Sequence, residues 1–328
     1  MRIVFAGTPD AAVPTLRALA GGSHEVTLVV TRPDAPLGRK RVLTPSPVAT
    51  AAVELGLPVL KTGRLDDDAT RRILSAEPDL GVVVAYGGLV REPLLSAPAH
   101  GWVNLHFSLL PRWRGAAPVQ RALIAGDERT GAAVFSLVPQ LDAGDVYATI
   151  ERAIGTDETA GDLLASLALE GARLVEQVID GIADGSARTE PQHGEPTLAA
   201  KLGIEDARLD PSRDAESVYA RLRGVTPEPG AFFTIDGSRV KVLVARRAEA
   251  DPLRCGEHPL RPGELLLQGA RAFLGTATAP LELVTVQPAG KRAMPGADWL
   301  RGVPAGTAAD LGEASSRSNT PTRTEVSS

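Results

Sequence analysis

Three polar side chains between residues 101 and 145 have the types and spacing that acyl transfer requires. Asn104 and His106 alternate with apolar residues. Because successive side chains of a strand point to opposite faces, we expect both on one face of a strand. An apolar strand predicted over 132–138 runs into a glycine-containing loop that carries Asp142. If the two strands are parallel neighbours, the three side chains converge at the carboxyl edge of the sheet, where open α/β sheets bind ligands.

These residue types match the steps of an acyl transfer that has no covalent enzyme intermediate. An asparagine can donate to a carbonyl oxygen, and a histidine can stabilise or protonate the developing oxyanion. A carboxylate can hold the histidine and help remove a proton from an attacking amine. A lone Asn or His at a strand end is more often structural, so the residue types alone leave both interpretations open.

Length and composition place limits on the class of protein. A chain of 328 residues suggests two domains. An apolar content of 43% supports a substantial core. The formal net charge of −5 argues against an indiscriminate nucleic-acid binder but leaves room for a local basic patch.

Cysteine and histidine usage predicts neither a disulfide nor a metal site. Cys255 is the only cysteine, which excludes an intrachain disulfide and fits a reducing compartment. The five histidines include no pair at ligand spacing, so we expect no metal.

No signal peptide is visible, and no apolar run approaches the roughly 20 residues that cross a bilayer. We therefore expect a cytoplasmic protein without membrane contact, and a monomer by default.

Several short motifs resemble one family. Around the three polar side chains, the chain resembles the formyltetrahydrofolate-dependent formyltransferases in Asn104-Leu105-His106, Ser108-Leu109-Leu110-Pro111 and Leu141-Asp142-Ala143-Gly144-Asp145. Within that family it is similar to the methionyl-tRNA formyltransferases in Gly7-Thr8-Pro9-Asp10, Thr44-Pro45-Ser46-Pro47, Pro111-Arg112-Trp113-Arg114-Gly115-Ala116-Ala117-Pro118 and Pro288-Ala289-Gly290-Lys291-Arg292-Ala293-Met294. The resemblance covers about residues 1–302.

The resemblance implies a reaction and a set of site residues. The reaction is transfer of a formyl group from 10-formyltetrahydrofolate to the α-amino group of methionyl initiator tRNA, with Asn104, His106 and Asp142 as catalytic residues. Many relatives have glycine after the histidine, where this chain has Phe107. By strand parity Phe107 points away from the site, so we expect the chemistry to be retained. The implied folate-binding residues are Tyr86, Gly87, Gly88, Leu89, Ser108, Leu109, Leu110 and Pro111.

A proline-rich basic loop spans residues 31–47. Its prolines exclude a helix or a central strand, and it contains four basic residues and one acidic residue. Charge alone is also compatible with a solvated surface loop. The resemblance implies that the loop enters the acceptor arm of initiator tRNA, with Arg39 contacting it and Lys40 and Arg41 neutralising phosphates. Relatives often have Gly-Arg-Gly-Lys-Lys here, and this chain lacks the second glycine.

We predict an α/β fold with two domains. Residues 1–189 form a Rossmann-like formyltransferase catalytic domain with a mainly parallel sheet, and 190–207 form a polar linker. Short apolar segments separated by Gly and Pro turns predict a small β-barrel over 208–302. The resemblance implies that this barrel is OB-like and is the tRNA-binding domain. Residues 303–328 are poor in apolar side chains, and we expect them to be disordered.

Two other functions remain open from the sequence. The nearer one keeps the chemistry but changes the acceptor to a sugar-nucleotide amine, a glycinamide ribonucleotide or water. The other is a non-catalytic nucleotide- or RNA-binding module, which would not need Asn104, His106 and Asp142 together. A dehydrogenase is disfavoured because the G-x-G-x-x-G fingerprint is missing.

Overall fold

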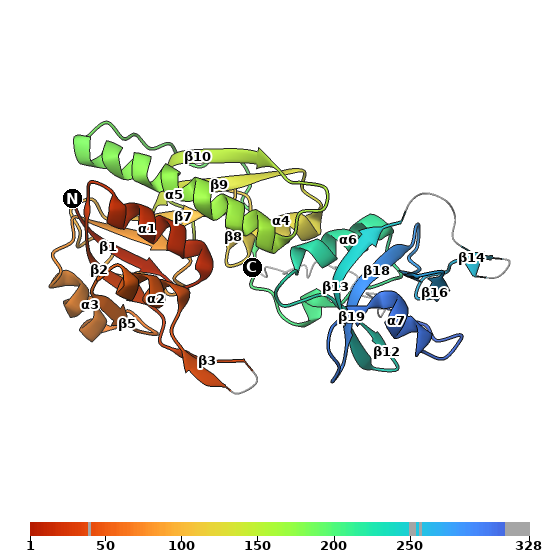
Figure 1. The fold of residues 1–328 in the computed structure, drawn as a ribbon. Helices are drawn as coiled ribbons and strands as arrows, with labels where there is room; N and C mark the ends of the chain where they lie inside the picture. Colours follow the sequence, from red (N-terminus) through yellow and green to blue (C-terminus); the bar gives the residue numbers. More distant parts are fainter. Residues whose placement is uncertain (39–40, 249–253, 256–257, 312–328) are drawn as a thin grey trace, which may run out of the picture. The chain divides into compact units, whose positions relative to one another are not determined.

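A computed structural model describes residues 1–38, 41–248, 254–255 and 258–311. The chain divides into two compact units (Figure 1). The first comprises Met1–Ala207 and Ala220–Gly230, and the second comprises Arg208–Tyr219 and the chain from Ala231 onward.

The first unit alternates strands and helices. In chain order its elements are β1 (Arg2–Gly7), a 3-10 turn (Asp10–Ala12), α1 (Val13–Gly21), β2 (Glu25–Thr31), β3 (Ala35–Leu37), β4 (Val42–Thr44), α2 (Pro47–Glu54), β5 (Val59–Lys61), α3 (Asp67–Leu74), β6 (Leu80–Val84), β7 (Trp102–His106), β8 (Arg114–Gly115), α4 (Pro118–Ala125), β9 (Arg129–Ser136), β10 (Val146–Ala153), α5 (Ala160–Asp184), β11 (Leu198–Ala199) and a second 3-10 turn (Glu205–Ala207). α6 (Ala215–Gly224) is shared between the two units.

A seven-stranded sheet organises the first unit, in the order β10-β9-β7-β6-β1-β2-β5. The pairs from β5 across to β7 are parallel. The β7–β9 and β9–β10 pairs are antiparallel. The prediction of an α/β domain with a mainly parallel sheet is confirmed.

Both faces of this sheet are covered, which explains its continuous apolar strands. Along β1, Ile3 and Phe5 lie in a core cluster with residues of α1, α2, α4 and α5. Val4 and Ala6 alternate with them and pack in a second cluster that includes residues of α3. Strand alternation thus divides the core into two layers.

The long helix α5 lies against the sheet beside α1 (Figure 1). A capping box between Thr159 and Asp162 starts it, and Gly185 in the left-handed conformation ends it. Gly171 allows α5 to approach β7, since a Cβ there would lie 2.8 Å from Leu105 Cδ2. The helix therefore supports the strand that carries Asn104 and His106 from behind.

The basic loop forms a separate two-stranded hairpin of β3 and β4, drawn in Figure 1 as a projection from the first unit's sheet. Its side chains are mostly exposed, including the apolar Leu37 and Leu43. This agrees with the expectation that the segment contributes no helix and no central strand.

The predicted linker over 190–207 is part of the first unit. Glu190 pairs with Val146 through two backbone hydrogen bonds of 2.8 and 2.9 Å. β11 pairs with β8 in parallel. The linker prediction is therefore wrong.

The second unit contains a mostly antiparallel sheet. Its elements are β12 (Phe232–Ile235), β13 (Ser238–Arg247), β14 (Arg254–Cys255), β15 (His258–Pro259), β16 (Leu265–Gln268), β17 (Arg271–Leu274), β18 (Leu281–Pro288), β19 (Met294–Pro295) and α7 (Gly296–Arg301). The main sheet has the order β12-β13-β18-β17-β16, with β19 paired to β18. This is the short-stranded β domain predicted for 208–302.

The chain after α7 continues to hydrogen-bond with this sheet. Ala308 bridges Glu264, just before β16, and the Asp310 amide donates to Thr234 O of β12 at 2.7 Å. The Asp310 carboxylate accepts the amides of Asp236 and Gly237, each at 3.1 Å. The segment thus joins the two ends of the sheet. The expectation of disorder is wrong for 303–311. The remaining residues of that prediction, 312–328, lie outside the described residues.

No helix in the described part of the chain is long and apolar enough to span a bilayer.

Truncation after Gly302 should lower the melting temperature, because it removes the strand-like contacts of 307–310. Several lost backbone hydrogen bonds at about 1 kcal/mol each correspond to a shift of about 5 °C or more. The measurement is thermal unfolding followed by circular dichroism. Truncation after Leu311 is the matched control and should leave the transition in place. Equal melting temperatures for the two truncations would contradict a structural role for the segment.

Candidate active site

β7 presents the predicted asparagine and histidine on one face of the sheet. Val103, Leu105 and Phe107 pack in the cluster that contains α5. Asn104 and His106 alternate with them and therefore lie on the opposite face. The parity prediction, including the direction of Phe107, is confirmed.

The imidazole of His106 is buried and has two different neighbours. Its Nε2 lies 2.8 Å from the backbone oxygen of Trp113, and its Nδ1 lies 3.9 Å from Asp142 Oδ2. Because a carbonyl only accepts hydrogen bonds, Nε2 carries the proton. In the neutral ring, Nδ1 then has its lone pair on the side of Asp142.

The protonation of His106 is set by burial and by its neighbours. Burial lowers the pKa of His106 below its ordinary value. The negative charge of Asp142 and the hydrogen bond to Trp113 O oppose part of this shift because both favour the charged ring. The ring is therefore neutral at pH 7 and able to accept a proton.

Asp142 is held by the backbone of another segment. Its Oδ2 accepts the amide of Gly115 at 2.7 Å, and its own φ is +46°, in the left-handed region. At 3.9 Å the His106–Asp142 pair is within ion-pair range but too long for a hydrogen bond. The expectation that Asp142 orders the histidine is corrected, since the Trp113 carbonyl does so.

The route by which Asp142 reaches His106 also differs from the prediction. β7 and β9 are antiparallel, with Asn104 opposite Phe135 and His106 opposite Ala133. β9 therefore ends near the start of β7, and the loop over 137–145 must turn back to bring Asp142 to the other end of that strand. His106 and Asp142 lie 3.9 Å apart, but the parallel pairing assumed for their strands is wrong.

Asn104 has a buried polar atom without a partner. Its Oδ1 is inaccessible to solvent and accepts no hydrogen bond from the described residues. The assignment of O and N in a side-chain amide depends on its hydrogen bonds, so the unsatisfied atom could equally be a donor. Buried polar atoms normally have partners. A ligand with a polar group would supply one here.

The segment after β7 is held mainly by its own contacts. Ser108 Oγ donates to Arg112 O at 2.6 Å. Arg112 and the Trp113 indole both donate to the carboxylate of Asp127. Of the predicted folate-lining residues, Pro111 is buried and Leu109 and Leu110 are partly exposed. The hydroxyl of Ser108 therefore supports the loop rather than facing a ligand.

The turn after β6 presents mainly backbone groups rather than free polar side chains. The Tyr86 side chain is buried, and its hydroxyl donates to Thr62 O at 3.1 Å. Burial raises the pKa of Tyr86, which keeps the phenol protonated. Gly87 has a φ of +78°, and a Cβ on Gly88 would lie 2.6 Å from the Tyr86 ring. Leu89 is exposed.

Of the predicted tRNA-contacting residues, the structure describes only Arg41. Arg39 and Lys40 are outside the described residues. Arg41 is exposed at the start of β4, and its amide donates to Gly38 O at 3.1 Å.

The sequence interpretation missed two residues next to this site. Thr197 Oγ1 accepts the Trp113 amide at 2.9 Å. Gln192 donates to backbone oxygens of the Asp142 loop. Both lie in the supposed linker, whose polar composition carries no periodicity that could indicate these contacts.

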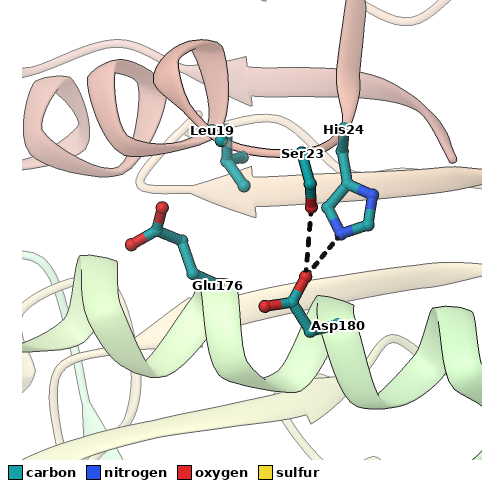
Figure 2. Close-up of a pocket in the computed structure, with 6 residues that line it drawn as sticks. Leu19, Ser23, His24, Glu176 and Asp180 are labelled. Atoms are coloured by element: carbon teal, nitrogen blue, oxygen red, sulfur yellow. Dashed lines mark hydrogen bonds and ion pairs between the residues drawn. The ribbon is translucent and has the colours of Figure 1, made fainter.

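A separate small pocket lies between α1 and α5. In Figure 2, Ser23 and His24 both contact Asp180, with Glu176 nearby. The groups satisfy one another, and none of the predicted site residues lines this pocket. No cluster of three or more potential metal ligands occurs among the residues that the structure describes.

Family models match both parts of the chain. The model described as formyl transferase matches residues 1–179, and the model described as formyl transferase, C-terminal domain, matches residues 201–304. The chain belongs to the formyltransferase family.

Curated relatives of this formyltransferase share most of its length. A methionyl-tRNA formyltransferase of Leifsonia xyli subsp. xyli is 62% identical over 302 residues, covering 92% of this chain and 97% of the relative. Proteins of the same name from Clavibacter michiganensis subsp. michiganensis and Arthrobacter sp. are 60% and 51% identical, with the same coverages.

Solved structures share the fold at low identity. HypX from Aquifex aeolicus in complex with tetrahydrofolic acid has a TM-score of 0.61 at 18% identity, covering 92% of this chain and 47% of HypX. This formyltransferase therefore spans about half the length of HypX. WlaRD, a sugar 3N-formyl transferase, has a TM-score of 0.59 at 14% identity, covering 89% of this chain and 99% of WlaRD. These likenesses support the fold alone.

Asp142→Asn should lower the pKa of His106 further. The carboxylate favours the charged imidazole, so its loss removes a contribution that raises this pKa. The measurement is an NMR titration of the histidine ring protons. Asp145→Asn, in the same loop, is the matched control and should leave His106 nearly unchanged. A rise in the His106 pKa of the Asp142→Asn variant would contradict the geometry.

Proposed function

We propose that this chain transfers the formyl group of 10-formyltetrahydrofolate to the α-amino group of methionyl initiator tRNA. The observation that carries the proposal is the grouping of a buried His106 and Asp142, 3.9 Å apart, with Asn104 on the same face of β7 as His106, its buried Oδ1 lacking a hydrogen-bond partner among the described residues. The acceptor follows from relatives of 51 to 62% identity that are named methionyl-tRNA formyltransferases.

His106 manages the proton in this proposal. Its neutral Nδ1 takes the proton that the attacking amine loses as the new C–N bond forms. Asp142 stabilises the resulting imidazolium from 3.9 Å without needing to take the proton itself. The imidazolium then gives the proton to the N10 nitrogen as its bond to the formyl carbon breaks. The step balances without any other acid or base.

Asn104 stabilises charge that develops during the transfer. Its amide NH2 can donate to the formyl oxygen, and its Oδ1 can accept an N–H of the attacking amine. These contacts would satisfy the atom that is otherwise buried and unpaired. Hydrogen bonds realised only in the transition state raise the rate most.

The co-substrate would be held by the segments 86–89 and 108–111. Since the hydroxyls of Tyr86 and Ser108 already bind protein carbonyls, the contacts to a flat heterocycle would come from backbone groups and apolar side chains. Open space around Gly87 and the exposed Leu89 fit such a ligand. When bound, 10-formyltetrahydrofolate supplies the activated formyl group.

The β3–β4 hairpin would contact the tRNA. The sequence Arg39-Lys40-Arg41 concentrates positive charge between the residues of β3 and those of β4, in a chain whose net charge is −5. Such side chains neutralise phosphates and orient the nucleic acid without reading its sequence.

His106→Ala should reduce the rate of formylation by about a hundredfold to a thousandfold, which is the loss expected when one such catalytic group is removed. The assay mixes the purified protein with 10-formyltetrahydrofolate and methionine-charged initiator tRNA and measures formyl-methionyl-tRNA, with free methionine as a negative acceptor. His100→Ala, at an exposed histidine just before β7, should be fully active. Binding of tRNA to the His106→Ala protein should be nearly unchanged.

The same assay tests the rival acceptors. If the intact protein formylates a sugar-nucleotide amine or a glycinamide ribonucleotide but not methionyl-tRNA, the transferase chemistry stands and the proposed acceptor is wrong. An active His106→Ala variant would instead contradict the catalytic assignment.

Arg41→Ala should raise the KM for methionyl-tRNA about three- to tenfold while leaving the KM for the folate unchanged, because one phosphate contact of about 1 kcal/mol is lost. Arg72→Ala, at an exposed arginine on α3, is the matched control. Steady-state kinetics at two salt concentrations provide the measurement. Unchanged tRNA kinetics for Arg41→Ala would assign the residue to the solvated surface.

A further inference from the structure

We propose that Gln192 is a positioning residue for the transfer, because it holds the loop that carries Asp142 in the conformation that directs the carboxylate toward His106. This inference rests on the proposed function for its kinetic test. Gln192 belongs to the segment over 190–207, which supplies none of the reacting groups in the proposed function.

Both hydrogens of the Gln192 amide are used on the Asp142 loop. Nε2 donates to Asp142 O at 2.9 Å and to Gly144 O at 2.8 Å. The Oε1 accepts Nε and Nη2 of Arg114 at 3.1 and 2.6 Å. One part-buried side chain thus ties together three segments that are distant in the sequence.

The loop requires such a contact because Asp142 adopts a φ of +46°. Residues other than glycine are uncommon in the left-handed region, although aspartate enters it more often than most, and contacts from outside the residue stabilise this conformation. Gln192 binds the backbone carbonyl of Asp142, and the Gly115 amide binds the carboxylate at 2.7 Å. The two contacts fix both ends of the same residue, which sets the direction of the carboxylate.

The contacts of Gln192 and Asp142 converge on the same neighbouring segment. Gly115 follows Arg114, so the segment that receives the Asp142 carboxylate also anchors the Gln192 oxygen. The backbone before Gln192 is itself fixed, since Glu190 and Val146 exchange two hydrogen bonds. Displacement of Gln192 would therefore be transmitted to Asp142 more than to the rest of the fold.

Glutamine suits this position better than its close analogues. Glutamate has the same shape but no N–H, so it could not donate to the two carbonyls. Its negative charge would repel their oxygens. Methionine has a similar length and no charge but makes neither set of hydrogen bonds. The two substitutions separate the donor role from simple space filling.

The experiment compares Gln192→Met with Gln177→Met, the same change at an exposed position on α5. We expect Gln192→Met to lower kcat for formyl transfer at least tenfold, with the KM for methionyl-tRNA changed by less than twofold. Gln192→Glu should behave in the same way, and Gln177→Met should match the parent protein. Unchanged kcat in both Gln192 variants would overturn the proposal.

A double-mutant cycle shows whether Gln192 acts through Asp142. In the Asp142→Asn background, Gln192→Met should reduce kcat by less than twofold further, because the carboxylate that it positions is already absent. A full additional tenfold loss would mean that Gln192 acts elsewhere and would overturn the proposal.

A third readout does not depend on the acceptor. Gln192→Met should shift the NMR-measured pKa of His106 downward, in the direction of Asp142→Asn, since a displaced carboxylate no longer favours the charged ring. This titration remains informative if methionyl-tRNA is not the acceptor, so failure of the proposed function and failure of this inference are distinguishable. A His106 pKa equal to that of the parent protein would contradict displacement of Asp142.

Discussion

The hydrogen bond between His106 Nε2 and the Trp113 carbonyl is the contact on which the site depends. At 2.8 Å it requires the proton on Nε2, because a carbonyl oxygen has only lone pairs to offer. The other ring nitrogen is thereby left as an acceptor beside Asp142. Burial keeps the ring neutral by lowering its pKa, so the ring is able to accept a proton. A histidine in the other tautomer would present a donor there and could not act as this base.

Much of the surrounding structure serves to hold that carbonyl in place. Asp127 accepts hydrogen bonds from the side chains of Arg112 and Trp113, and Thr197 accepts the Trp113 amide. From behind, α5 packs on β7 at the position of Gly171. His106 and Asp142 thus lie at the end of a strand and on a loop that is tied to neighbouring segments, a common arrangement of sites on α/β scaffolds.

The antiparallel pairing at one edge of the sheet determines how Asp142 reaches His106. Because β9 runs against β7, the loop after β9 has to return across the site to deliver Asp142. Asp142 takes the left-handed conformation there, which is uncommon for residues other than glycine, asparagine and aspartate. The segment over 190–199 pairs with β8 and supplies Gln192 to two carbonyls of the loop. A stretch that looks like a connector is therefore part of the first unit.

The sequence by itself determined which side chains share a face and which family the motifs resemble. Alternation along β7 placed Asn104 and His106 opposite Leu105, since the period of a strand is a local property. Local periodicity carries no information about the direction of the next strand, so the antiparallel pairing of β9 was decided only in the tertiary structure. The same holds for 190–207 and 303–311, whose contacts are made largely by backbone amides and carbonyls. Every residue except proline has both of these groups, so their pairing leaves almost no trace in the sequence.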